Sequence, residues 1–402
     1  MKVLISPMAA MAETGGPTSR CRLLVAGFKN AGIEVATCMA KDVNYKEISG
    51  VKNFFIDVPM PMGMPEFIAK RSFPVAQKLG ITSKKRVTSF DQVLWLTGNL
   101  DYKYLKKSVE SFKAAINEFE PDIVYSEFNI SAMIAAKALG VKLYSTVSFP
   151  TQHIYAHDAK KAQDLNRLLT EMSMQPVESA LQLFDWADKK ICPSIPELEP
   201  FSNPEVVFCG TLKKVSKGRD GVISSEAQDS KADTDSQESG SRNKILVYMG
   251  NGTISASKTL EVIREAYSGS SYQVYIASSY LKEQTLGNIH VAPRWDFNQL
   301  LDESVLFINH GGQNSIVDGL LHGVPQIMVP GKVFERIYNA KSVTNNRAGM
   351  GISQDSFTAK TIRKYTERML DSDLMSRNAK QLGEKLVSAG GVDVIVDLIN
   401  EK

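Results

Sequence analysis

The chain has 402 residues, of which 43% are hydrophobic and 23% are charged, so fibrous and wholly disordered proteins are excluded. This length exceeds the roughly 250–300 residues that one compact core usually reaches, and it predicts about two domains. The 47 basic and 44 acidic residues leave a net charge of +3, which argues against a nucleic-acid partner.

The cysteines and the N-terminus indicate the compartment. The four cysteines are widely spaced and contain no Cys-x-x-Cys pair: Cys21, Cys38, Cys192 and Cys209. Neither a zinc site nor a disulfide framework is therefore expected, and a reducing cytoplasm is the expected location. The apolar stretch from Lys2 to Ala12 is short and contains Pro7, which favours a first β-strand over an export signal. No segment reaches the ~18 unbroken apolar residues of a spanning helix, so any membrane contact is expected to be peripheral.

Short apolar runs alternate with amphipathic stretches along the first half of the chain. Strands are expected at Val3–Ile5, Ile33–Cys38, Phe54–Val58, Ile123–Tyr125, Leu143–Val147 and Lys190–Cys192. Helices are expected at Thr18–Asn30 and at about 102–119, 129–139 and 160–184. This alternation predicts a parallel sheet wrapped by helices, and we assign residues 1–212 to such a Rossmann-like, acceptor-binding domain.

The composition then changes, and a second cycle of strands follows. Residues 213–243 are rich in Ser, Asp, Glu, Lys and Gly and predict a flexible linker or disordered insertion. Further strands are expected at Lys244–Met249, Gln273–Ala277, Ile289–Val291, Val305–Ile308 and Gln326–Val329. Each except the third is followed by a helix-like segment. Residues 244–385 are therefore expected to form a second, nucleotide-sugar-binding domain, and residues 386–402 a C-terminal helix that packs back on the first. The fold class is α/β, with two facing doubly wound domains and a ligand cleft between them at the carboxyl ends of the strands.

The most informative stretch runs from Val305 to Ser315. A buried strand ends at Asn309, Gly311 and Gly312 let the backbone turn, and a helix starts near Gln313. Free amide hydrogens and the positive end of the helix dipole would stabilise a diphosphate at this point. Three further residues can add hydrogen-bond donors: His310, Asn314 and Ser315. Considered alone, His310 could instead be a residue that ends a strand and whose ring nitrogen is hydrogen-bonded within the protein.

This run resembles the donor-binding signature of inverting two-domain glycosyltransferases, which include UDP-glycosyltransferases and macrolide glycosyltransferases. In that family a His-x-Gly-x-Asn-Ser run is followed by an acidic residue, a Gly-x-Pro turn and a Pro-rich strand end, matched here by Asp318, Gly323, Pro325 and Pro330. The resemblance covers roughly 244–370 well. It implies transfer of a hexose-type sugar from a nucleoside diphosphate sugar, expected to be UDP-linked, to a small-molecule or lipid-like acceptor. Inversion at the anomeric carbon, no cofactor and no metal are also implied.

The resemblance also implies a donor pocket. His310 would contact the phosphates, with Gly311, Gly312, Asn314 and Ser315 lining the same pocket, and Asp318 would lie near the ribose. Glu335 and Arg336 fall where the family has Asp-Gln at the sugar hydroxyls, and the cation of Arg336 could favour an acidic sugar or reach a phosphate. The turn at Gly250, Asn251 and Gly252 would approach the donor, and Arg294 and Trp295 lie where the base is held. The alternatives are turn glycines, a packing tryptophan and an exposed Glu-Arg pair at a helix start.

The catalytic base is missing from its usual place. The family's base is a His after the first strand, but no His precedes His153, and Pro17 takes that position. The loop instead has Glu13, Gly15, Gly16 and Thr18, a glycine turn that predicts either a phosphate or carboxylate cradle or plain helix capping by Thr18. Glu127 or Glu13 could be the base, the acceptor could be already ionised, or the chain could bind a nucleotide sugar without turnover.

The acceptor and the rival functions are less strongly encoded. The segment Pro59–Pro65, with Phe67, Trp95 and Phe149, predicts an apolar surface for a hydrophobic acceptor, although such residues also serve as core filler. A nucleotide-sugar epimerase and a silent sugar-nucleotide-binding partner of another transferase are the alternatives. The one Asp-x-Asp near the C-terminus, at Asp371, is interpreted as a helix cap rather than a metal site.

Overall fold

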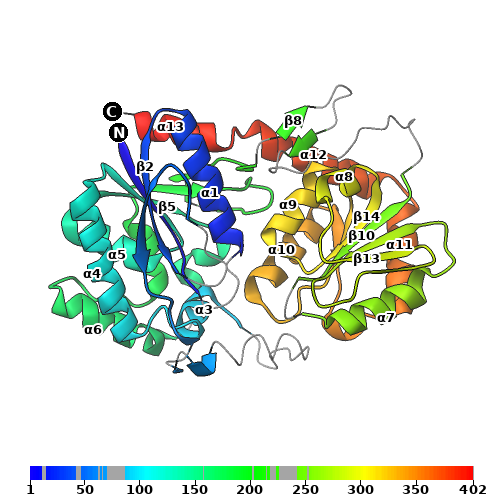
Figure 1. The fold of residues 1–402 in the computed structure, drawn as a ribbon, viewed down its shortest axis with the longest axis horizontal. Helices are drawn as coiled ribbons and strands as arrows, with labels where there is room; N and C mark the ends of the chain where they lie inside the picture. Colours follow the sequence, from blue (N-terminus) through cyan, green and yellow to red (C-terminus); the bar gives the residue numbers. More distant parts are fainter. Residues whose placement is uncertain are drawn as a thin grey trace. The chain divides into compact units, whose positions relative to one another are not determined.

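The computed structural model of the chain describes residues 1–10, 15–41, 47–61, 64–65, 67–69, 87–156, 158–201, 203–213, 215–217, 223–225, 242–250 and 253–401. They form two compact units, each with its own sheet (Figure 1). The first lies within Met1–Pro74, Val87–Leu212 and Ala389–Lys402, and the second within Lys213–Ser388. None of the described helices is both long enough and apolar enough to cross a membrane.

The first unit is built on a seven-stranded parallel sheet in the order β3-β2-β1-β4-β5-β6-β7. Its strands are β1 Lys2–Pro7, β2 Glu34–Ala40, β3 Lys52–Ile56, β4 Ile123–Glu127, β5 Lys142–Thr146, β6 Lys189–Cys192 and β7 Val206–Phe208. Strand order reverses between β1 and β4, so the loops after these two strands diverge at the carboxyl edge, where open sheets bind ligands.

Helices cover both faces of this sheet. The α-helices are α1 Gly15–Asn30, α3 Phe90–Leu96, α4 Tyr102–Phe119, α5 Ile130–Leu139, α6 Gln163–Glu171 and α13 Val392–Asn400. The 3₁₀ turns are η2 Phe149–Thr151, η3 His153–Tyr155, η4 Ala159–Ala162 and η5 Ala180–Trp186. One core lies between the sheet and α1 with α13, and the other between the sheet and α4, α5 and η5. In Figure 1 the C-terminal helix α13 runs beside α1, and a side chain added at Gly27 would come 2.3 Å from Val392, so the two helices are in close contact.

Two helix predictions in this unit need correction. The helix expected at 160–184 is interrupted, because Ser173 has φ +58° and Pro176 cannot donate a backbone hydrogen bond; α6 therefore ends at Glu171 and η5 forms separately. Helix α1 begins at Gly15 rather than at Thr18. Pro17 is tolerated in its first turn, where the amide hydrogen that proline lacks would have no partner within the helix.

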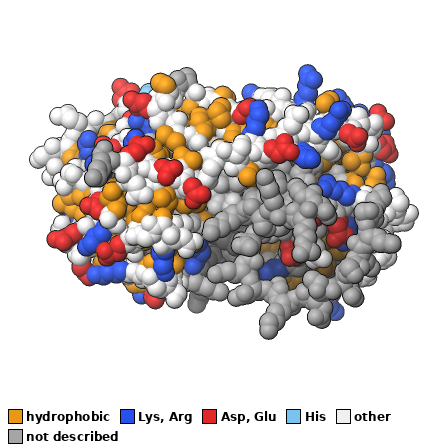
Figure 2. Space-filling view, turned by 90° about the horizontal axis from the view of Figure 1, so that it is seen from above, with side chains coloured by type: hydrophobic (Ala, Val, Ile, Leu, Met, Phe, Trp, Pro, Cys, Tyr) orange, Lys and Arg blue, Asp and Glu red, His pale blue; other side chains and the backbone are white. Residues whose placement is uncertain are grey.

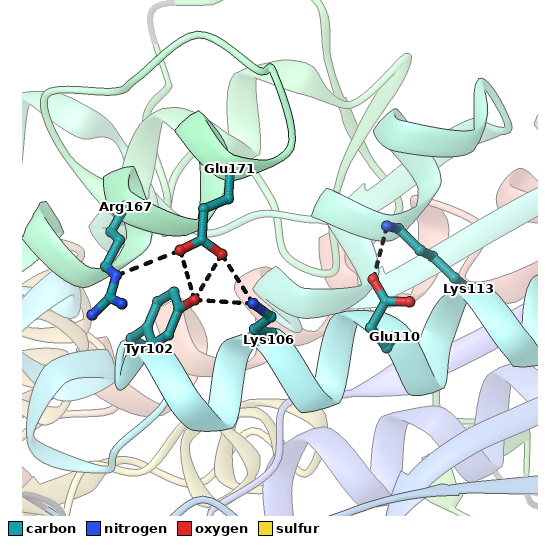
Figure 3. Close-up of polar contacts among 6 residues, drawn as sticks. All are labelled: Tyr102, Lys106, Glu110, Lys113, Arg167 and Glu171. Carbon is teal, nitrogen blue, oxygen red and sulfur yellow. Dashed lines mark hydrogen bonds and ion pairs between the residues drawn. The ribbon is translucent and has the colours of Figure 1, made fainter.

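Exposed polar contacts join α4 to α6. Figure 3 shows Tyr102 and Lys106 of α4 converging on Glu171 of α6, at 2.7 Å and 3.1 Å, with the Arg167 guanidinium 3.5 Å from the same carboxylate. Exposed ion pairs of this kind contribute little to stability. We therefore treat this cluster as a solvated helix surface.

The second unit holds a seven-stranded sheet in the order β12-β13-β11-β10-β14-β15-β16, parallel except for β12. Its strands are β10 Lys244–Tyr248, β11 Gln273–Ala277, β12 Gln284–Leu286, β13 Ile289–Ala292, β14 Ser304–Asn309, β15 Gln326–Met328 and β16 Gly349–Gly351. Its helices are α7 Ala256–Tyr267, α8 Phe297–Asp302, α9 Gln313–Leu321, α10 Phe334–Asn345, the 3₁₀ turn η6 Gln354–Ser356, α11 Ala359–Leu370 and α12 Leu374–Ser388.

Successive residues of β10 enter opposite cores of this unit. Ile245 and Val247 pack towards α7 and α11, whereas Leu246 packs towards α8. The predicted connections differ after two strands. The third expected strand, now β13, is followed by α8. The second, β11, is followed not by a helix but by β12, which pairs antiparallel with β13. Antiparallel neighbours need only a short connection, so no crossover helix is required there.

Two short strands lie in the segment predicted to be a linker. Strand β8 Val215–Lys217 pairs antiparallel with β9 Ile223–Ser225, and most of the remaining segment lies outside the described residues. On the face drawn in Figure 2, basic and acidic side chains are interspersed, in keeping with the small net charge of +3.

Candidate functional site

The turn between β14 and α9 is fixed by its own side chains. Gly311 has φ +79°, a backbone conformation that favours glycine. The Asn309 side chain accepts a hydrogen bond from the Gly311 amide at 2.8 Å and donates to the Gln326 side chain at 2.8 Å. Asn339 of α10 donates to the Gly311 carbonyl at 3.0 Å. The backbone is thus held with Gly312 as the N-cap of α9, whose first amides have no partner within the helix.

The His310 ring lies in a slot between two glycines. A side chain added at Gly312 would come 2.6 Å from Nε2, and one added at Gly250 would come 3.0 Å from the ring. The Tyr248 ring packs edge-on against it, with 5.5 Å between centroids. His310 is only 9% exposed, and its Nδ1 has no hydrogen-bond partner among the described residues. A buried polar nitrogen of this kind is normally paired, so the unpartnered Nδ1 is consistent with a ligand-binding position.

The charge around His310 keeps the ring neutral. Burial, followed by the nearby Arg336 cation, lowers the pKa of His310 to about 3, against a smaller opposing effect from a hydrogen bond with the Tyr248 backbone. Neutral imidazole has one N–H donor and one acceptor nitrogen. With its one proton on Nδ1, the neutral ring could donate to a phosphate oxygen, and the formal positive charge would come from another residue.

Arg336 supplies that positive charge. It lies in the first turn of α10, and its Nη1 donates to the Thr253 hydroxyl at 2.7 Å. A side chain added at Gly311 would come 3.1 Å from the Arg336 carbonyl, so the start of α10 packs against the glycine turn. Burial lowers the pKa of Arg336, while Glu335 opposes the shift, and a guanidinium stays protonated at neutral pH.

The other predicted donor residues differ in their surroundings. Ser315 is buried and Asn314 half-buried in the first turn of α9, whereas Glu335 is exposed. The Asp318 carboxylate forms an ion pair with Lys213, so its predicted role at the ribose would compete with an existing partner. Asn251 and Gly252 lie outside the described residues.

Trp295 is anchored by packing. Its Nε1 donates to the Ile276 carbonyl at 3.1 Å, and its ring stands edge-on to Tyr275 with 5.1 Å between centroids. The neighbouring Arg294 is exposed. Trp295 therefore supports the loop after β13 through its packing, whereas the Arg294 side chain extends into solvent.

The predicted residues of the second unit come from neighbouring strand ends. Gly250 follows β10, Arg294 follows β13, His310 follows β14 and Arg336 follows β15. Parallel neighbours place these loops at one edge of the sheet, which is the ligand-binding edge of this fold. The motif at His310 thus has the structural setting that its interpretation requires.

Glu127 has a different setting in the first unit. It is the last residue of β4 and is 0% exposed. Its Oε1 accepts from the Arg20 Nε at 2.5 Å, and its Oε2 accepts from the Thr146 hydroxyl. The Arg20 guanidinium also lies 5.5 Å from the Phe128 ring centroid. A general base must present a lone pair to its substrate, and this carboxylate has both oxygens engaged. This geometry argues against the predicted base role.

The other predictions in the first unit are only partly covered. Glu13 lies outside the described residues, and Gly15, Gly16 and Thr18 form the first turn of α1, so Thr18 is not its cap. Phe67 and Trp95 are among the exposed large apolar side chains. In the apolar segment that precedes them, residues 62 and 63 lie outside the described residues. Phe149 instead packs on Tyr155, with 5.2 Å between ring centroids.

The sequence interpretation assigned no role to several residues that build the candidate site. Asn309, Asn339 and Thr253 fix the turn or hold Arg336. The role of Asn309 could have been predicted from its place at the end of an apolar strand, because a buried side-chain amide needs hydrogen-bond partners. Thr253 carried no such signal. Within the described parts of the chain, no group of three or more His, Cys, Asp or Glu side chains is placed to hold a metal ion.

Sequence comparisons agree with this setting. The C-terminal domain model of the erythromycin biosynthesis protein CIII-like family matches residues 279–400. Aclacinomycin-T 2-deoxy-L-fucose transferase of Streptomyces galilaeus is 29% identical over 115 residues, 28% of this chain and 26% of that protein. The uncharacterized UDP-glucosyltransferase YdhE of Bacillus subtilis is 23% identical over 167 residues, 40% of this chain and 42% of that protein. The chain therefore matches only about a quarter to two-fifths of the length of these curated relatives.

Solved structures extend the likeness to the whole chain at the level of fold. CalG4, the calicheamicin glycosyltransferase, has a TM-score of 0.72 and 16% identity over 99% of this chain and 97% of its own. The spinosyn rhamnosyltransferase SpnG has a TM-score of 0.69 and 14% identity, with full coverage of both chains. The predicted α/β fold with two Rossmann-like domains is confirmed. The C-terminal part of the chain is thus similar in sequence to erythromycin CIII-like and UDP-glycosyltransferase proteins, and the whole chain is similar in fold to two-domain glycosyltransferases.

Proposed function

We propose that the chain transfers a sugar from a nucleoside diphosphate sugar to a small-molecule or lipid-like acceptor, with inversion at the anomeric carbon. One observation carries this proposal: His310 is buried beside the N-terminus of α9 and keeps a ring nitrogen without a partner among the described residues. A diphosphate bound at this helix end would satisfy that nitrogen and the amides of the first turn together.

The chemistry follows from charge at the leaving group. As the bond between the anomeric carbon and the diphosphate breaks, negative charge grows on the departing oxygen. Helix amides, the His310 N–H and the Arg336 cation would stabilise that charge without rearranging, because neighbouring contacts already hold each in place. We therefore propose a metal-independent reaction without a cofactor.

The donor is proposed to be a pyrimidine nucleoside diphosphate sugar. A UDP donor is favoured by the name of the Bacillus subtilis relative. A thymidine diphosphate donor is the alternative, since SpnG has been solved with thymidine diphosphate and also with its spinosyn aglycone. The aglycone complex supports a hydrophobic acceptor, and the reaction is proposed to take place in the cytoplasm.

The test is a panel of UDP- and dTDP-sugars with and without hydrophobic hydroxylated acceptors, followed by diphosphate release. Acceptor-dependent release supports the transferase. Acceptor-independent release would indicate an epimerase or hydrolase, and binding without release a silent partner. In the same assay His310→Ala should abolish release, and full activity of that variant would overturn the proposal.

A further inference from the structure

A histidine and an aspartate form an exposed pair in the first unit. His153 lies in the turn η3, which follows β5, and Asp185 lies in η5. The His153 Nδ1 is 3.2 Å from the Asp185 Oδ2, and the side chains are 51% and 55% exposed. With Nδ1 directed at a carboxylate, the other ring nitrogen, Nε2, is the one available to accept a proton.

The other described histidines do not offer this arrangement. His290 has Nδ1 3.3 Å from the Thr285 hydroxyl and Nε2 3.0 Å from the Gln273 side chain. His322 is buried with its Nδ1 2.7 Å from Asp302, and it belongs to the second unit. His310 is buried at the donor turn. Among the described residues, only His153 combines an oriented ring, exposure and a place in the first unit.

Both partners are mounted on anchored backbone. Thr151 and Ser148 close a capping box at η2, just before His153, and the Phe149 ring packs against Tyr155 just after it. On the other side, η5 buries four residues that precede Asp185 in sequence: Ala180, Leu181, Leu183 and Phe184. Local packing therefore holds the backbone at both positions, and the contact between Nδ1 and the carboxylate orients the two side chains.

The position also suits the reaction. Open α/β sheets bind ligands at the carboxyl ends of their strands, and His153 is on the loop after β5. In the sheet order, β5 is two strands from β1, after which the resembling family has its base. Two strand spacings amount to about 10 Å between strand axes, and the loops after β1 and β5 both leave the carboxyl edge of the sheet.

We propose that His153 is the general base of this chain and that Asp185 is its positioning residue. Nε2 removes the proton of an acceptor hydroxyl as that oxygen bonds to the anomeric carbon. The bond from that carbon to the diphosphate breaks, and its electron pair leaves with the diphosphate. Asp185 holds the ring with Nδ1–H directed at its carboxylate and stabilises the imidazolium, which then gives its proton to solvent. This inference rests on the proposed transferase function.

The experiment compares His153→Ala and Asp185→Asn with Lys160→Ala, a control at an exposed position of the neighbouring turn η4. His153→Ala should lower acceptor-dependent turnover by about 10²–10⁴-fold, and added imidazole should restore part of it. Asp185→Asn should lower kcat with little change in KM, and Lys160→Ala should leave both unchanged. All three should keep the wild-type Tm, because exposed pairs contribute little to stability.

Binding of UDP and dTDP, measured by calorimetry on the same variants, separates the two proposals. Unchanged nucleotide binding with lost and imidazole-rescued turnover supports the dyad. Wild-type turnover in His153→Ala overturns the dyad proposal. Intact nucleotide binding in that variant would show that the proposed function itself still stands. Lost turnover with no rescue and a lowered Tm also overturns it, since His153 would then be structural. Absence of nucleotide binding in the wild-type chain would instead refute the proposed function.

Discussion

Replacing Glu127 by glutamine distinguishes a structural carboxylate from a catalytic one. The substitution keeps the shape and one acceptor oxygen but removes the negative charge that faces Arg20 at 2.5 Å. Glu127 is fully buried and the Arg20 side chain is 10% exposed, so the substitution would remove the opposite charge from beside a largely desolvated guanidinium. The structure therefore predicts a large loss of stability.

The magnitude follows from the burial. Removing one partner of a buried ion pair typically costs about 3–5 kcal/mol, because the other charge stays uncompensated. For a unit of this size each kcal/mol lowers Tm by about 2–4 °C. The transition of the first unit should therefore move down by about 6–20 °C. Changing both Arg20 and Glu127 to methionine should recover part of this loss, since apolar replacement of a buried pair is often neutral.

The assay is thermal unfolding together with turnover per folded molecule at low temperature. A matched control is Glu118→Gln, which removes the same charge from an exposed ion pair with Lys52 in the same unit and should change stability by less than about 1 kcal/mol. Turnover of folded Glu127→Gln should stay within about tenfold of wild type, whereas loss of a general base costs about 10²–10⁴-fold. An unchanged Tm with turnover lowered by that factor would refute this reasoning and restore Glu127 as the base.

Three further predictions concern the donor turn. Gly250→Ala should weaken UDP or dTDP binding at least tenfold in calorimetry, because the added methyl group would press on the His310 ring. In the control Gly287→Ala, the glycine has a similar positive φ but the added methyl group meets nothing within 4 Å. Equal effects of the two substitutions would contradict this cause. Tm measured from pH 7 to pH 4 should fall more steeply in wild type than in His310→Asn. The pKa of buried His310 is lowered to about 3 in the folded protein, so below the ordinary histidine pKa the unfolded chain takes up a proton that the folded protein does not. The free energy of unfolding should therefore decrease by up to about 1.4 kcal/mol per pH unit as the pH falls. Equal slopes of Tm against pH in the two proteins would contradict the burial of His310. Arg336→Gln should reduce nucleoside diphosphate affinity about tenfold while nucleoside affinity stays the same, and a loss of both would assign Arg336 to packing instead.

The fold could be predicted where residues repeat with a clear period. The runs at Ile123 and Val305 are apolar, uninterrupted and bounded by polar residues, and both became buried strands. Strand β16 could not be found this way, because Gly-Met-Gly carries no strand propensity and is held by its contacts with β15 and α10. The break after α6 depends on Ser173 in a left-handed conformation, which sequence periodicity does not encode.

The candidate site could be predicted from the sequence where its functional residues lie close together in one motif. His310 and its glycines form a local motif, so its geometry could be anticipated from adjacent residues. The pairing of Arg20 with Glu127 joins residues 107 positions apart, and that of His153 with Asp185 joins residues 32 positions apart. Such pairs depend on which strand ends meet at the sheet edge, and no single-sequence pattern reports them.

The most direct test of the account is calorimetric titration of inorganic pyrophosphate, UDP and dTDP into the wild-type chain and into Gly312→Ala. Gly312 has an ordinary φ of −68°, so the added methyl group strains no backbone and acts only through its 2.6 Å approach to His310. The account predicts that the wild type binds a nucleoside diphosphate and that this binding is lost in Gly312→Ala while Tm is kept. Equal affinity in the two proteins would show that the diphosphate does not bind at this turn.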